Sequence, residues 1–135
     1  MKILVTGGAG FIGSHVADAC IRDGHSVAIV DDLSMGTQRN INPKAAFHKI
    51  DIRDERIAEI FRSGQFDIVI HHAAQMDVRK SVEDPIFDAS VNVLGSLNLL
   101  EQCRRHHVRK FIFASTGGAI YGNQDYFPAD EAHPV

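Results

Sequence analysis

Four glycines fall within seven residues near the start of the chain, in the stretch TGGAGFIGSH from Thr6 to His15. A short apolar run that favours a strand precedes this stretch, and a run with helical character follows it. Gly8, Gly10 and Gly13 fit the pattern G-x-G-x-x-G, and Gly7 adds the reading G-x-x-G-x-x-G. Between a strand and a helix, this spacing is typical of a turn that binds a dinucleotide.

Each glycine has a physical role in such a turn. Gly7 and Gly8 allow the chain to turn tightly off the strand, and Gly10 leaves room for a pyrophosphate to approach the backbone. Gly13 lets the helix pack closely on the sheet. The free N–H groups and the positive end of that helix would then bind the phosphate charge.

An acidic pair follows the second predicted strand. Asp31 lies 18 residues beyond Gly13, close to the offset at which an acid meets the adenosine ribose. Its carboxylate would accept hydrogen bonds from the ribose hydroxyls and repel a 2′-phosphate, which favours NAD over NADP. Asp32 is adjacent and could share this role. The alternative is that the glycines only form a turn and the acids only cap it.

Apolar runs alternate with helical patterns along the rest of the chain. We predict strands at 2–6, 25–30, 45–50, 66–71 and 108–114, and helices at 11–23, at 53–63 and from Pro85 onward. This alternation predicts an α/β fold, a doubly wound parallel sheet (Rossmann-like) with helices on both faces. Residues 116–135 are predicted to be loop. Because compact domains rarely end in so long a loop, we expect the chain to stop before the domain is complete.

The predicted helices have apolar faces and stop signals. In the first, we expect one apolar face, formed by Ile12, Val16, Ala19 and Cys20. Gly24 and Gly64 are predicted stop signals. In the long helix, the repeat runs through Phe87, Val91, Leu94 and Leu97.

Composition excludes several classes of function. The net charge is −3 without a basic stripe, which argues against a nucleic-acid partner. No apolar run approaches the roughly 20 residues of a membrane-spanning helix, and the N-terminus lacks the pattern of a secretion signal. Cys20 and Cys103 are far apart, which is typical of reduced, buried thiols in a cytoplasmic protein.

Two histidine pairs could suggest a metal site, namely His71 with His72 and His106 with His107. Neighbouring side chains on a strand or a helix point in different directions, and no acid or cysteine stands at ligand spacing. We therefore predict no metal. His71 is expected in the strand core, and His72 is expected beside the cofactor cleft.

Six segments, in register along the chain, resemble the extended short-chain dehydrogenase/reductase family, specifically its NAD-dependent sugar-nucleotide epimerases and dehydratases. They are TGGAGFIGSH, VDDLSMG (30–36), DIRD (51–54), HHAAQ (71–75), SVNVLGSLNLLE (90–101) and STGGAIYG (115–122). The resemblance implies NAD as cofactor, held by Gly7, Gly10, Phe11, Ile12, Gly13, Asp31, Asp32, Asp51, Ile52, His72, Ala73, Ala74, Gln75 and Asn92. For Asn92, a plain structural role as a polar bridge to a neighbouring strand stays open.

Within this family the UDP-glucose 4-epimerase branch is most similar, through VDDLSMGTQRNI and FASTGGAIYG. That likeness implies epimerisation at C4 of a UDP-hexose by transient hydride transfer, and a homodimer for the full-length enzyme. Thr116 would hydrogen-bond the reacting sugar oxygen, with Ser115 as the alternative, because the segment is one residue longer than the common family form. A hydroxyl that only satisfies local backbone also remains possible.

The family's catalytic Tyr-x-x-x-Lys pair has no match in this sequence. Tyr121 is followed four residues later by Asp125, and Tyr126 by Asp130. We therefore expect residues 1–135 to form a partial NAD-binding domain without its C-terminal substrate domain, and to be inactive by themselves. A sugar-nucleotide dehydratase or decarboxylase and a non-catalytic NAD-binding module are the alternatives. Gly117 and Gly118 follow Thr116 where dehydratases carry an acidic pair, which favours an epimerase.

Overall fold

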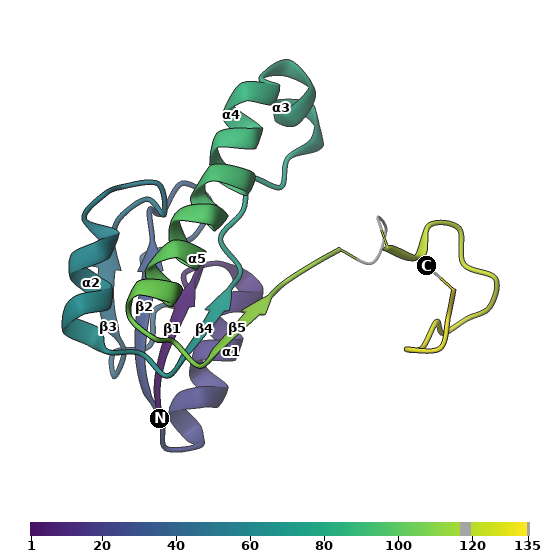
Figure 1. Ribbon diagram of the computed structural model, residues 1–135. Helices are drawn as coiled ribbons and strands as arrows, with labels where there is room; N and C mark the ends of the chain where they lie inside the picture. The colour runs from purple at the N-terminus through teal and green to yellow at the C-terminus, as the bar shows by residue number, and fades with distance from the viewer. Residues whose placement is uncertain (117–119, 135) are drawn as a thin grey trace.

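The computed structural model describes residues 1–116 and 120–134, and five parallel strands form a sheet between helices (Figure 1). The strands are β1 (Lys2–Thr6), β2 (Ser26–Asp31), β3 (Ala46–Lys49), β4 (Ile68–His71) and β5 (Lys110–Phe113). Their order is β3-β2-β1-β4-β5, so the chain winds outward from β1 to β3 and then returns to place β4 on the other side of β1. The doubly wound sheet predicted from the sequence is confirmed.

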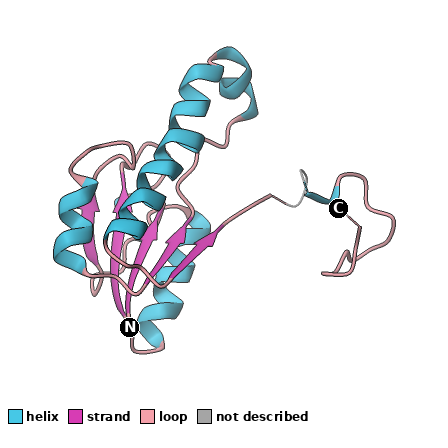
Figure 2. Ribbon diagram, in the orientation of Figure 1, coloured by secondary structure: helices cyan, strands magenta, loops and turns pink. Residues whose placement is uncertain are grey.

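Helices cover both faces of this sheet (Figure 2). They are α1 (Phe11–Arg22), α2 (Ile57–Gly64), α3 (Val78–Glu83), α4 (Pro85–Ala89) and α5 (Ser96–Arg105), with a three-residue 3₁₀ turn η1 (Gln38–Asn40) and a π-helical turn η2 (Ser90–Gly95). Alternate residues of each strand point to opposite faces. Leu4 and Val30 thus pack with Phe61 of α2 and Leu99 of α5, whereas Ile29 packs on the α1 face.

The first turn of the predicted second helix is absent, because α2 begins at Ile57 rather than at Arg53. The Asp51 carboxylate accepts a hydrogen bond from the Arg53 N–H at 2.8 Å, and Asp54 accepts one from the Arg56 N–H at 2.9 Å. Such local bonds hold the backbone in turns instead of a helix. At its other end, Gly64 is the last helical residue, and Gln65 at φ 49° provides the left-handed stop.

The predicted long helix is interrupted. The segment from Ser90 to Gly95 forms a π turn. The helix α3 forms in a segment for which no helix or strand was predicted, and the Asp77 carboxylate accepts from the Arg79 N–H at 2.9 Å. A π turn adds a residue and rotates the helix face that follows it. Leu94 and Leu97 are therefore 61% and 54% exposed, and the helix instead buries the residues Gly95, Leu99, Gln102 and Cys103. In α1, Ile12 is likewise exposed rather than on the buried face.

Beyond β5 the chain leaves the sheet (Figure 1). The Ala114 N–H still donates to the His71 carbonyl at 3.1 Å, and the described residues beyond it lie away from the sheet. The predicted loop is confirmed over most of 120–134, apart from a helical turn at Ile120 and Tyr121; Gly117 and Gly118 lie outside the described residues. β5 is an edge strand of the sheet, and Phe113 on it is 57% exposed.

Candidate functional site

The glycine turn lies at the carboxyl end of the central strand, β1. Gly7 has φ +69°, and its N–H donates to the Val30 carbonyl at 2.8 Å. A Cβ atom on Gly7 would stand 2.6 Å from the Ala73 nitrogen in the loop after β4. A Cβ atom on Gly13 would overlap the Gly7 carbonyl oxygen. Both glycines are thus required because backbone segments meet there.

The N-terminus of α1 is open to an anion. Gly10 is the N-cap, and no side chain of the described residues caps this helix end or places a carboxylate in its first turn. The first backbone bond of the helix runs from the Ser14 N–H to the Gly10 carbonyl at 3.1 Å, so the N–H groups of Phe11 and Ile12 precede it. These donors and the helix dipole fit a phosphate group.

Asp31 stands beside this turn, at the end of β2. It is 8% exposed, and its two oxygens accept from the Ala9 N–H at 3.0 Å and the Leu33 N–H at 2.8 Å. A carboxylate offers about four acceptor positions, so the capping role and a ribose contact are compatible. Asp32 is exposed and accepts two bonds from Ser34 within its own loop. The structure therefore places Asp31 closer to the turn than Asp32.

At the end of β3, Asp51 forms an ion pair with Arg53 at 2.5 Å. The hydrogen bonds and charge of the guanidinium lower the pKa of the Asp51 carboxyl. Ile52 is buried, and its carbonyl accepts from the Asn98 amide at 2.7 Å. Asn98 lies on α5, so this helix holds the loop after β3 in place.

The loop after β4 reaches the same edge of the sheet. His72 and Ala73 are half-buried, Ala74 is exposed, and burial lowers the pKa of His72. Asn92 binds Gln75 twice: its Oδ1 accepts from the Gln75 N–H at 2.8 Å, and its Nδ2 donates to the Gln75 carbonyl at 2.9 Å. The asparagine thus bridges the helix to this loop.

The predicted catalytic hydroxyl groups lie apart from the predicted cofactor-binding residues. Ser115 and Thr116 follow β5, are exposed, and lie where the chain leaves the sheet (Figure 1). Tyr121 instead packs edge-on against His133, with ring centroids 5.5 Å apart. The cofactor candidates therefore converge on the ends of β1 to β4, whereas the catalytic candidates occupy the margin beyond β5.

Sequence reasoning missed three residues that hold this edge together. Asn98 fixes Ile52, and the Asn40 amide donates to the Ala9 carbonyl at 2.9 Å. Ser96 bonds both His71 and the Asn92 carbonyl. The polar residues of SVNVLGSLNLLE, which interrupt an otherwise apolar helix, were the available signal for Ser96 and Asn98.

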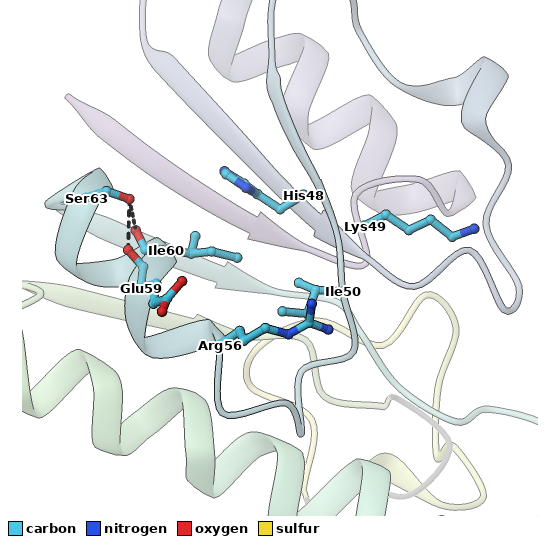
Figure 3. Close-up of a pocket in the computed structure, with 7 residues that line it drawn as sticks. All are labelled: His48, Lys49, Ile50, Arg56, Glu59, Ile60 and Ser63. Atoms are coloured by element: carbon cyan, nitrogen blue, oxygen red, sulfur yellow. Dashed lines mark hydrogen bonds between the residues drawn. The ribbon is translucent and has the colours of Figure 1, made fainter.

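A cavity of about 350 Å³ lies elsewhere, between β3 and α2 (Figure 3). Its lining residues are His48, Lys49, Ile50, Arg56, Glu59, Ile60 and Ser63. The Ser63 hydroxyl is turned back onto the Glu59 carbonyl at 2.8 Å. None of the predicted site residues lines this cavity, so the candidate site is the strand-end edge with its glycine turn.

Neither a metal centre nor a membrane segment emerges in the parts of the chain that the structure describes. Within 1–116 and 120–134, His, Cys, Asp and Glu side chains do not gather in threes or more as metal ligation would require. Over the same residues, every helix is too short or too polar to cross a bilayer.

Comparison with known proteins identifies relatives over the whole chain. The family model for the NAD dependent epimerase/dehydratase family matches residues 3–135. The UDP-glucose 4-epimerase of Mycolicibacterium smegmatis is 42% identical over 140 aligned residues, which cover 100% of this chain and 45% of that protein.

Solved structures agree with this result. UDP-glucose 4-epimerase from Thermotoga maritima, crystallised with UDP-glucose, superposes with a TM-score of 0.90 at 50% identity. The Thermus thermophilus enzyme, in complex with NAD, superposes with a TM-score of 0.90 at 48% identity. In both cases 99% of this chain is covered, but the chain spans only 44% of the solved protein.

Proposed function

The chain belongs to the NAD-dependent epimerase/dehydratase family, and from that premise we propose that it forms the NAD-binding part of a UDP-glucose 4-epimerase. The observation that carries the proposal is the uncapped N-terminus of α1 at the glycine turn, with the Asp31 carboxylate beside it. Ligands of doubly wound sheets bind at this strand-end edge, where the winding reverses.

In this proposal each segment has a defined task. The turn from Gly7 to Gly13 would hold the pyrophosphate through backbone N–H groups, and Asp31, with or without Asp32, would hold the adenosine ribose. Asp51 and Ile52 would hold the adenine. The segment from His72 to Gln75, braced by Asn92, would meet the other half of the dinucleotide.

The proposed reaction is the inversion of C4 in a UDP-hexose, interconverting UDP-glucose and UDP-galactose. When bound, NAD supplies a reversible hydride acceptor for that carbon. Thr116, or alternatively Ser115, would orient the reacting sugar hydroxyl for loss of its proton. Because the sequence contains no Tyr-x-x-x-Lys pair, we expect no turnover by residues 1–135 alone. In a protein as long as the matched relatives, the remaining polypeptide would supply that pair and the UDP-sugar pocket.

We propose that the full-length enzyme forms a homodimer. Apolar side chains on α3, α4, η2 and α5 are more than half exposed, namely Val78, Val82, Ile86, Val93, Leu94 and Leu97. Such an exposed apolar group is typical of an interaction surface. Sedimentation of a chain with the length of the relatives, with and without Leu94→Glu, would test the homodimer.

A titration with NAD and NADP tests the cofactor assignment. The chain should bind NAD more tightly, and Asp31→Asn should narrow the difference, because the repulsion of a 2′-phosphate is lost. Asp67→Asn is the matched control, since that carboxylate binds the Lys2 N–H at the other end of β1. Equal affinity for both dinucleotides in the unaltered chain would contradict the ribose assignment.

Two other functions are separated by assays on the longer chain. A dehydratase or decarboxylase would convert a sugar nucleotide without forming its C4 epimer, and a binding module would bind NAD without turnover. Formation of UDP-glucose from UDP-galactose would support the epimerase against both. Loss of the sugar nucleotide without UDP-glucose would indicate a dehydratase or decarboxylase, and no conversion would indicate the binding module.

A further inference from the structure

His71 is a buried polar residue to which the proposed function assigns no role. It is the last residue of β4, is 2% exposed, and lies directly opposite Thr6, the last residue of β1, in the parallel register. Its ring is flanked by Phe111 and Phe113, with centroid distances of 5.7 and 5.6 Å. Burying an imidazole among aromatic rings destabilises the fold unless both of its nitrogens form hydrogen bonds.

Both nitrogens are paired with hydroxyl groups. Nδ1 lies 2.6 Å from the Thr6 Oγ1, and Nε2 lies 3.0 Å from the Ser96 Oγ at the start of α5. The Ser96 hydroxyl has one proton and donates it to the Asn92 carbonyl at 2.6 Å. Ser96 must therefore accept from His71, which places the imidazole proton on Nε2 and leaves Nδ1 to accept from Thr6.

This chain of bonds ends at the loop after β4. Asn92, whose carbonyl anchors Ser96, binds both backbone groups of Gln75 with its side chain. On the other side, the Thr6 hydroxyl is 3.4 Å from the Ala73 N–H. His71 is thus linked to the two ends of the segment Ala73–Gln75, once through Thr6 and once through Ser96 and Asn92.

The position of this segment follows from the strand order. The glycine turn lies at the end of β1, and Asp31 lies on the β2 side of it. A dinucleotide whose pyrophosphate lies at the turn therefore extends its second nucleoside toward β4. ADP, which lacks that second nucleoside, would not reach the segment.

We propose that His71 is a positioning residue of the NAD site: protonated on Nε2 and bare on Nδ1, it fixes the backbone of Ala73–Gln75 against which the second half of the dinucleotide binds. This inference rests on the proposed function as an NAD-binding domain. Burial also lowers the pKa of His71 to about 4, so the neutral ring persists at neutral pH.

The tautomer is tested without any ligand. Long-range ¹H–¹⁵N correlation spectra of the chain, assigned with a His71→Phe variant, should show a protonated Nε2 and a bare Nδ1. A proton on Nδ1 would overturn the bond directions and the proposal with them.

The positioning role is tested by comparing NAD with ADP. Ser96→Ala removes the acceptor of the Nε2 proton, and we expect about fivefold weaker NAD binding, the effect of one neutral hydrogen bond, with ADP affinity unchanged. His71→Phe should show the same selectivity, and His71→Gln, whose amide can donate to Ser96, should recover part of the loss. Equal losses for NAD and ADP would mean that His71 only supports the fold.

Ser63→Ala is the matched control, because Ser63 makes the same type of bond to the carbonyl four residues before it on α2, away from the dinucleotide edge. It should leave both affinities unchanged. If the unaltered chain fails to bind NAD, the proposed function itself falls. If it binds NAD and Ser96→Ala binds equally well, only the positioning role falls.

Discussion

Replacing Gly10 with alanine should separate dinucleotide binding from folding. Gly10 has φ −77° and ψ 173°, an extended conformation that alanine adopts without strain. A Cβ atom there would meet the Gly7 carbonyl oxygen at 3.2 Å, a contact relieved by a shift of a few tenths of an ångström. The substitution thus leaves the turn intact and places a methyl group at the mouth of the proposed phosphate site.

The expected energies follow from opposing terms. Alanine is a poorer N-cap than glycine by about 0.5–1 kcal/mol, whereas its stiffer unfolded chain returns about 0.4–1 kcal/mol. The free energy of unfolding should therefore change by less than about 0.5 kcal/mol. Gly13→Ala differs, because its Cβ would overlap the Gly7 carbonyl and stand 3.0 Å from the Gly8 Cα. Opening that backbone contact should cost about 1–3 kcal/mol.

Urea unfolding and calorimetric titration with NAD measure both quantities on the same protein. Gly10→Ala should weaken NAD binding at least about tenfold, or 1.4 kcal/mol, with little change in unfolding. Gly24→Ala is the control, because Gly24 has φ +81° in open space beyond the far end of α1. It should cost about 1 kcal/mol of stability and leave NAD affinity unchanged. Undiminished NAD binding by Gly10→Ala would refute the placement of the pyrophosphate at α1.

Three further outcomes are expected. Between pH 7 and pH 5, His71 should lower the free energy of unfolding by about 2 kcal/mol, because its pKa is about 4 in the fold and 6.5 in the unfolded chain, so only the unfolded chain takes up the proton in this range. Urea unfolding at both pH values measures the fall, and it should be about 2 kcal/mol smaller in His71→Phe. Burial raises the pKa of the Cys103 thiol to about 11, so a disulfide reagent at pH 8 should modify it only after unfolding, whereas the half-buried Cys20 reacts first. Gly95→Ala should destabilise the chain by about 1–3 kcal/mol, because the new Cβ would stand 2.6 Å from the Ile52 side chain; thermal unfolding measures it.

The sheet could be predicted because its information is local. Each buried parallel strand is an apolar run, and helical patterns separate the runs. Five strands in a doubly wound parallel sheet could therefore be predicted from spacing and from the handedness of crossovers, whereas the strand order came from the structure. The glycine turn could also be predicted from the sequence. Its backbone contacts leave no room for a side chain at Gly7 or Gly13, so glycine must stand at these positions.

Elements set by specific side-chain bonds could not be read in the same way. The delayed start of α2 depends on carboxylates of Asp51 and Asp54 that bind nearby N–H groups, which compete with helix formation. The π turn at Ser90–Gly95 is invisible to a period of 3.6, and it moved Leu94 from the expected stripe to an exposed position. Likewise, the partners of His71 lie 65 residues before it and 25 residues after it.

Three asparagines show what the loops at the strand-end edge require. Loop backbone cannot join the sheet ladder, so its N–H and C=O groups need other partners. Asn40 binds the Ala9 carbonyl, Asn98 binds the Ile52 carbonyl, and Asn92 binds both backbone groups of Gln75. Short amide side chains thus fix the three segments that would surround a dinucleotide, before one binds. Because less ordering remains to be done on binding, this edge is suited to hold a cofactor tightly through backbone contacts.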